Sequence, residues 1–144
     1  MTVIHRSALV EYSVEHMFDI VNDIEQYPQF MQGCISAKVK SQSEHELIGE
    51  LCLSKAGIRQ CFTTKNTLRR PRNIEMKLLE GNFASFNAEW RFEALRRDAC
   101  KIVFDLEFEY KSGIANFAAE KLFSSSANNL VDALVGRAKQ VCSS

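Results

Sequence analysis

Two groups of side chains in this sequence have the types and spacing to bind a partner molecule. The first is apolar: Trp90 and Phe92, and further on Phe104 and Phe108, alternate with polar residues, so each pair shares one face of a predicted strand. Concave walls of such side chains line most sites for apolar ligands. The same pattern is also typical of an ordinary packed core, and the residues alone leave both alternatives open.

The second group is basic and lies at predicted turns. It consists of Lys55, Arg59, Arg69, Arg70 and Arg72. If the hairpin tips that carry these residues converge at one end of the sheet, the cations would form a patch for RNA phosphates. Scattered surface charge that is balanced by nearby acidic residues is the alternative.

Residues for catalysis or metal binding are scarce. No GxSxG, HExxH, P-loop or GxGxxG motif occurs, and no two of the three histidines have the spacing of metal ligands. Gln60, Thr64 and Asn66 share one face of a predicted strand and could point inward. They keep a cyclase-like or dehydratase-like enzyme as a third hypothesis. We expect no catalytic residue, no metal and no covalently bound cofactor.

Composition bounds the class of protein. The chain has 144 residues, 46% of them hydrophobic, which is typical of one domain spanning 1–144. Its 18 Lys and Arg balance 18 Asp and Glu, so the net charge is zero and we expect no general DNA binding. No stretch approaches the ~20 apolar residues of a bilayer span, and no signal peptide is evident. The five cysteines are scattered without a CxxC pair. We therefore expect a reduced, cytoplasmic protein with buried cysteines, no disulfide framework and no zinc site.

The elements that must position these residues follow from hydrophobic periodicity. A strand is predicted at 2–11, and Ser13 is the expected N-cap of a helix whose apolar spacing continues to Ile24. A second short helix should follow at 24–31. From Gly33 to Lys111 the period is two, which predicts six strands at 34–42, 46–54, 58–69, 74–81, 86–94 and 100–111. Their short connections imply antiparallel hairpins.

The C-terminal segment returns to helical spacing after Gly113. Its first apolar stripe is Ile114, Phe117, Ala118 and Leu122, and a second runs from Leu130 to Val141. The two stripes do not share a face, so we expect a long helix that bends at Ser124–Ser126, or two helices. Only this segment is large enough to cover the apolar face of the sheet. The predicted fold is α+β: about seven curved antiparallel strands around one long helix.

Several motifs resemble a known family. Residues 27–34, Tyr-Pro-Gln-Phe-Met-Gln-Gly-Cys, resemble the YPxFLPxC signature of the coenzyme-Q-binding, START-like domains, which are grouped with polyketide cyclases and lipid transport proteins. Residues 79–83 and 90–92 resemble the family's DGPF and WxF elements, and 127–138 its terminal helix. The resemblance covers essentially the whole chain. Gln32 and Asn82 stand where the family has prolines, in loops that are expected to border a cavity mouth.

This resemblance implies the helix-grip fold, which the periodicity indicates independently. It also implies non-enzymatic binding of ubiquinone, or a related isoprenoid quinone or lipid, between sheet and helix in support of respiration. The expected cavity residues are Phe30, Met31, Phe62, Trp90, Phe92, Phe104, Phe108, Leu130, Val131 and Leu134.

The resemblance is strongest to the family's bacterial ribosome association toxins. These members are described as binding the large ribosomal subunit and blocking subunit joining. The alternative function is therefore ribosome association, with the large subunit and a small antitoxin as partners and the basic turns as the contact.

Overall fold

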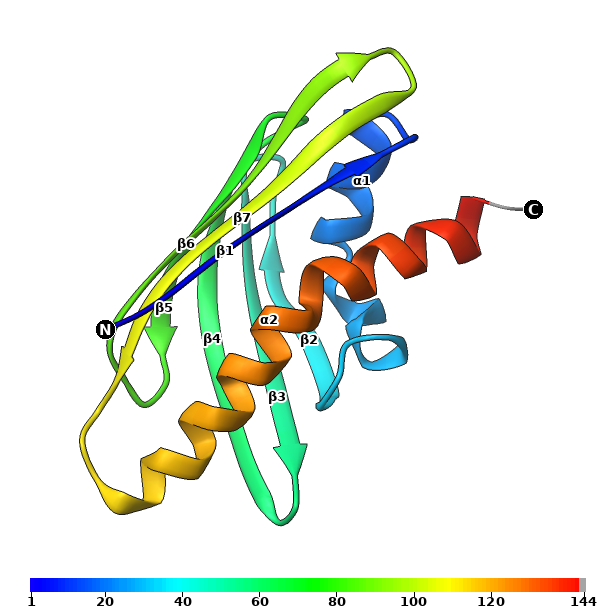
Figure 1. Cartoon of the computed structure of the whole chain (residues 1–144). Coiled ribbons are helices and arrows are strands. Elements are labelled where there is room, and N and C mark those ends of the chain that lie inside the picture. Colours follow the sequence, from blue (N-terminus) through cyan, green and yellow to red (C-terminus); the bar gives the residue numbers. More distant parts are fainter. Residues whose placement is uncertain (143–144) are drawn as a thin grey trace.

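Seven strands form one antiparallel sheet in the order β1-β7-β6-β5-β4-β3-β2 (Figure 1). The computed structural model describes residues 1–142, and of residues 114, 115 and 142 it describes the backbone alone. The strands are β1 Thr2–Val10, β2 Cys34–Gln42, β3 Glu46–Lys55, β4 Ile58–Arg69, β5 Asn73–Glu80, β6 Phe83–Arg96 and β7 Ala99–Tyr110. The strand count and the antiparallel pairing agree with the prediction.

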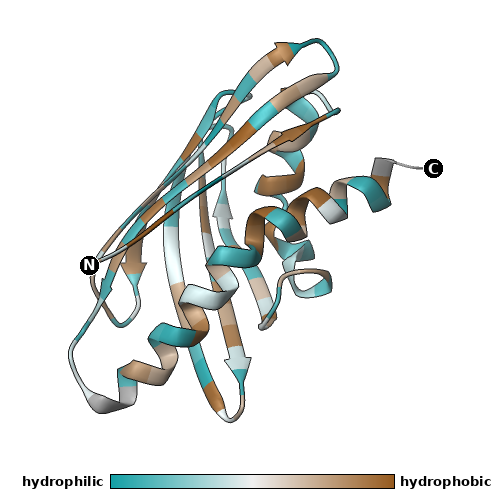
Figure 2. Ribbon diagram, viewed as in Figure 1, coloured by the Kyte–Doolittle hydropathy of each residue, from teal (hydrophilic) through white to brown (hydrophobic). Residues whose placement is uncertain are grey.

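Three helices accompany the sheet. Helix α1 (Val14–Asn22) begins at Ser13, whose side chain accepts a hydrogen bond from the backbone N–H of His16, and the 3₁₀ helix η1 (Ile24–Gln29) follows. Helix α2 (Ile114–Cys142) crosses the concave side of the sheet (Figure 1). Figure 2 shows apolar residues alternating with hydrophilic ones along the strands and along α2, as burial of one face requires. Among residues 1–142, no helix is long and apolar enough to cross a membrane.

Helix α2 is continuous over its 29 residues, so the alternative of two separate helices is wrong. Ser126 is only 1% exposed, and a Cβ on Gly33 would lie 3.0 Å from its Oγ. Two small residues therefore meet where the helix crosses the end of η1 and the start of β2. The first stripe was misplaced in part: Phe117 is 62% exposed and Ala118 is exposed, whereas Leu122 is buried as expected, together with Ala119 and Phe123. With this rotation the two halves share one buried face. The side chain of Ile114 lies outside the described residues.

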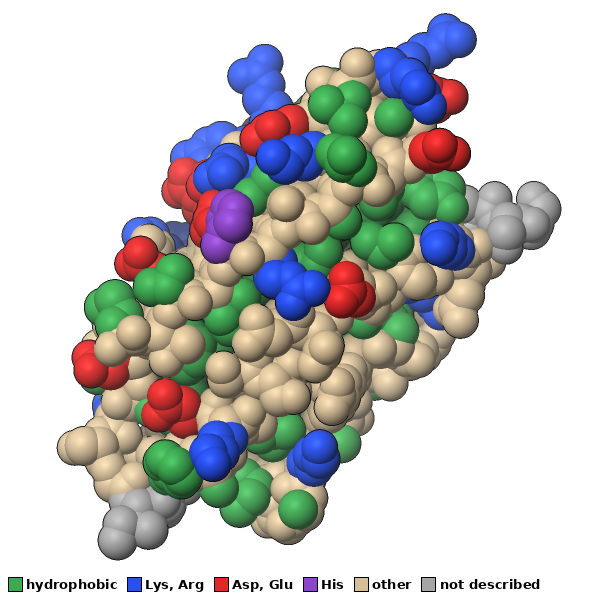
Figure 3. Space-filling view, viewed as in Figure 1, with side chains coloured by type: hydrophobic (Ala, Val, Ile, Leu, Met, Phe, Trp, Pro, Cys, Tyr) green, Lys and Arg blue, Asp and Glu red, His purple; other side chains and the backbone are tan. Residues whose placement is uncertain are grey.

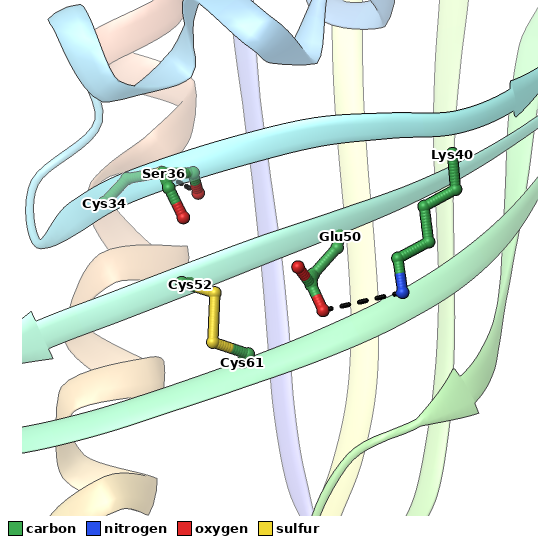
Figure 4. The surroundings of a disulfide bond; sticks show 6 residues. All are labelled: Cys34, Ser36, Lys40, Glu50, Cys52 and Cys61. Atoms are coloured by element: carbon green, nitrogen blue, oxygen red, sulfur yellow. Dashed lines mark hydrogen bonds and ion pairs between the residues drawn. A yellow bond between two sulfur atoms is a disulfide. The ribbon is translucent and has the colours of Figure 1, made fainter.

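A disulfide corrects the expectation of fully reduced cysteines. Cys52 of β3 and Cys61 of β4 are bonded to each other (Figure 4). The β3–β4 turn at Ala56–Gly57 makes the two cysteines register partners, although they are nine positions apart in sequence. Their side chains alternate with the inward-facing Phe62 and therefore lie on the convex face of the sheet. Cys34 and Cys100 are free and buried, as expected.

Candidate functional site

A cavity of about 60 Å³ lies between the concave face of the sheet and the helices. The sheet contributes Gly49, Leu51, Phe62, Thr64, Asn66, Ile74, Met76, Phe86, Ala88, Trp90, Phe104 and Leu106. The remaining wall is formed by Val21, Asn22, Ile24, Tyr27, Met31, Phe123, Ala127 and Leu130. None of these side chains carries a charge. Because one water needs 10–15 Å³ on this measure, the space holds about four waters.

Half of the residues expected at a cavity line this one. Met31, Phe62, Trp90, Phe104 and Leu130 do so. The other five pack elsewhere in the structure: Phe30, Phe92, Phe108, Val131 and Leu134 are absent from the wall.

Contacts of their rings show where three of these five residues pack. The ring of Phe92 packs against Phe18 of α1 with centroids 5.4 Å apart, and that of Phe108 packs against Phe123 at 4.8 Å. Phe30 lies outside the cavity, where the guanidinium of Arg137 sits 5.6 Å from its ring centroid. These side chains support the cavity or the surface beside it.

Six aromatic rings close the cavity at its lower end, the end of the sheet that carries the β3–β4 turn in Figure 1. They are Phe62, Phe83, Phe86, Phe108, Tyr110 and Phe123. Strict alternation predicts that Phe83 and Phe86 lie on opposite faces of β6. A register shift between Phe83 and Ser85 instead brings both rings into the cluster. Bulges of this kind leave no signal in the hydrophobic pattern of a single strand.

A hydrogen-bonded chain ties the same end together. The hydroxyl of Tyr110 donates to Oε1 of Gln60, and Nε2 of Gln60 donates to the carbonyl of Ala119 at 2.7 Å. Strands β7 and β4 are thereby joined to α2. Burial raises the pKa of Tyr110 well above its ordinary value, so this phenol stays a donor at any physiological pH.

The opposite wall depends on a glycine. A Cβ on Gly49 would collide with Cδ1 of Ile24, and Gly49 is the register partner of Thr64. Ile24 therefore lies over β3 at the level of Thr64 and covers the cavity where α1 passes into η1. Only a residue without a side chain allows this approach.

Few polar groups reach the cavity. Thr64 and Asn66 point inward, as the alternation in β4 predicts, and the Thr64 hydroxyl donates to Oδ1 of Asn66 at 2.8 Å. Tyr27 donates its hydroxyl to the Val21 carbonyl at 2.5 Å, and burial raises its pKa. Within the described residues, no three His, Cys, Asp or Glu side chains could together hold a metal ion.

The predicted basic residues do not form one patch. Lys55 and Arg59 lie at the lower end, whereas Arg69, Arg70 and Arg72 lie at the other end of β4, about 33 Å away at ~3.3 Å per residue (Figure 1). Arg69 pairs with Glu75 at 2.9 Å, and Arg70 pairs with Asp19 at 2.8 Å. The hypothesis that these turns converge at one end of the sheet was wrong, because they lie at opposite ends of β4. Figure 3 shows basic and acidic side chains interspersed over the visible face.

Known proteins resemble the chain at two levels. A family profile described as polyketide cyclase / dehydrase and lipid transport matches residues 10–135. The ribosome association toxin RatA of Vibrio cholerae is 42% identical over 141 residues, which cover 98% of each chain. The mitochondrial coenzyme Q-binding protein COQ10 of Drosophila melanogaster is 22% identical over 134 residues, which cover 90% of this chain and 55% of that protein.

Solved structures show the same fold. The Zhui aromatase/cyclase from a Streptomyces species superposes with a TM-score of 0.83 at 15% identity and covers 96% of this chain and 94% of its own. A START superfamily protein from Mycobacterium smegmatis superposes with a TM-score of 0.78 at 22% identity and covers 96% and 98%. The curved sheet around one helix is thus the helix-grip arrangement of the START and cyclase proteins.

Proposed function

The chain belongs to the polyketide cyclase / dehydrase and lipid transport family, and from this premise we propose that it is a binding protein, not an enzyme, whose cavity takes an isoprenoid quinone or a similar neutral lipid. The observation that carries the proposal is the cavity itself, which is lined mainly by aromatic and aliphatic side chains and has no charged group on its wall. Sites of this composition hold apolar ligands. The likeness to a coenzyme Q-binding protein supports the quinone class. With a quinone as ligand, we infer a role in respiration.

The size of the cavity determines how a quinone can be accommodated. A benzene ring occupies a cavity of about 150 Å³, so both the quinone ring and its isoprenoid tail need further room between α2 and the sheet. Each CH₂ that leaves water stabilises a complex by about 0.8 kcal/mol before ordering costs, so even one isoprene unit would favour opening. Affinity should therefore rise with the first isoprene units.

The test is direct titration. Trp90 is the single tryptophan and lies on the cavity wall with its ring stacked on Phe104, centroids 4.3 Å apart. Ubiquinone with one isoprene unit should quench its fluorescence at a stoichiometry of one, and an organic extract of the purified protein should contain quinone. Ala88→Leu fills the cavity and should abolish quenching, whereas Ala99→Leu, away from the wall, should not. Equal quenching of both variants would contradict the assignment.

A second function is supported by a separate observation. Relatives that are 38–42% identical over almost the whole chain carry the name ribosome association toxin. We infer that this chain also binds the large ribosomal subunit, with or without a small antitoxin as regulator. Lys55 and Arg59 have no ion pair among the described residues, and Arg59 borders a surface hollow with Asn82 and Asn116. This lower basic turn, Lys55 with Arg59, is the better candidate contact, because the cations Arg69 and Arg70 are already paired with carboxylates.

Co-sedimentation with large subunits tests this inference. Lys55→Glu/Arg59→Glu should reduce binding at least tenfold. Wild-type binding should fall steeply between about 50 and 200 mM salt, because contacts with phosphates release counterions from the RNA. Arg96→Glu/Arg97→Glu makes the same charge change at the β6–β7 turn and is the matched control. Loss of binding in the control alone would move the contact to the other end of the molecule.

A further inference from the structure

Asn66 presents an unused hydrogen-bond donor to the cavity. Its side chain is 6% exposed and lies on the cavity wall. Its register partners are Leu47 on β3 and Met76 on β5, both apolar. Among the residues that the structure describes, none accepts a hydrogen bond from its amide NH₂. Since the amide nitrogen is not fully enclosed by protein atoms, an acceptor on a molecule in the cavity can reach it.

Thr64 fixes the direction of that donor. Its hydroxyl, 4% exposed, donates to Oδ1 of Asn66 at 2.8 Å, so the carbonyl end of the amide is occupied. The NH₂ end must then face away from Thr64, along the apolar wall of the cavity. The two side chains stand two residues apart on the same face of β4 and act as one unit: Thr64 positions, and Asn66 donates.

We propose that the Asn66 amide is a head-group subsite that donates a hydrogen bond to a carbonyl oxygen of a neutral ring bound in the cavity. The inference rests on the proposed ligand-binding function and names the part of the ligand that is recognised. The bound ring would widen the cavity, whose volume is about 60 Å³. The wall carries no charge, so a carboxylate head would be buried without a partner and is excluded.

Three ring compounds of similar size separate these features. Tetramethyl-1,4-benzoquinone has the carbonyl acceptors, tetramethylbenzene lacks them, and trimethylbenzoate carries a charge. Calorimetric titration of the wild-type protein should show tighter binding of the quinone than of the hydrocarbon, and no binding of the benzoate. Because Asn66→Leu removes one hydrogen bond to the quinone, it should weaken quinone binding about five- to thirty-fold. The affinity for the hydrocarbon should change by no more than about two-fold.

Two variants make the result specific. Thr64→Val keeps the shape but frees the Asn66 amide to rotate, so it should weaken quinone binding by less than Asn66→Leu does. Met76→Leu changes an apolar neighbour on the same wall and should leave the quinone-to-hydrocarbon ratio unchanged. Cooperative thermal melting of each variant confirms that it is folded. Asn66→Leu that binds the quinone as tightly as wild type overturns the subsite while the binding function stands. Wild-type protein that binds neither ring overturns the proposed function itself.

Discussion

Cys52 of β3 and Cys61 of β4 face each other across the hairpin with Cα atoms 4.0 Å apart, and their disulfide closes the turn that carries Lys55 and Arg59. A cross-link over so short a loop still restricts the unfolded chain, by about 2–3 kcal/mol. We expect Cys61→Ser to lower the free energy of unfolding by about that amount, measured by urea denaturation without reductant.

The thiol count checks the same bond. Unfolded wild-type protein should titrate two fewer thiols without reductant than after reduction, whereas Cys61→Ser should not show this difference. Cys34→Ala is the control, because Cys34 is a free cysteine and its loss should leave the two-thiol difference in place. Equal counts in the wild type would show that the hairpin is not cross-linked.

Gly49 and Gly136 should respond to alanine with opposite signs. A methyl group at Gly49 would meet Ile24, which must shift, at a cost of about 1–3 kcal/mol. Gly136 lies exposed inside α2 with no atom near its added Cβ, so alanine there should stabilise by about 0.5–1 kcal/mol. Urea denaturation of both variants measures the two signs.

A double mutant locates the cause at Gly49. Ile24→Val shortens the side chain that the new methyl group meets, so Gly49→Ala should cost less in that background than in the wild type. An equal cost in both backgrounds would contradict the contact with Ile24.

Alanine should cost much more stability at the buried Phe83 than at the exposed Phe117. Phe83 is buried, with its ring centroid 4.4 Å from that of Tyr110 and 5.0 Å from that of Phe123. Phe83→Ala should cost about 3–5 kcal/mol of stability, whereas Phe117→Ala, at an exposed position, should stay within about 0.5 kcal/mol. Both values come from chemical denaturation, and a small loss at Phe83 would mean that the cluster reseals without it.

The sequence predicted strands and turns well because each strand has one wet and one apolar face. The observed bounds of β2 and β4 equal the predicted ones, β3 differs by one residue at its end, and β5 differs by one residue at each end. Alternation also placed Trp90, Phe104, Thr64 and Asn66 on the inner face. Period and turn residues are local signals, and they were sufficient for these features.

Features that depend on pairing between strands were not predictable in this way. The disulfide depends on which residue of β3 lies opposite Cys61, and the separation of the basic turns depends on the length of β4. Phe83 entered the aromatic cluster through a register shift, and the single face of α2 depends on the meeting of Ser126 with Gly33. Each of these is a relation between distant residues, which no window along one strand or helix contains.

The buried thiols give the fold a predictable dependence on alkaline pH. Burial raises the pKa of Cys34 to about 11 and that of Cys100 to about 11, from an ordinary value of 9.0. The folded protein therefore holds these protons more tightly than the unfolded chain. Their contribution to stability is complete below pH 9 and is lost as the pH rises through about 11.

Denaturation midpoints at pH 8, 9.5 and 10.5 should accordingly fall along the series. Tyr27 and Tyr110, whose pKa values are also raised by burial, add to the fall in the same direction above pH 10. Cys34→Ala/Cys100→Ala removes the two thiols and should show a shallower decline between pH 8 and 9.5, where the phenols of the unfolded chain are still mostly protonated. A decline as steep as that of the wild type in this interval would assign the effect to other groups, because unfolding would then release the same number of protons without either thiol.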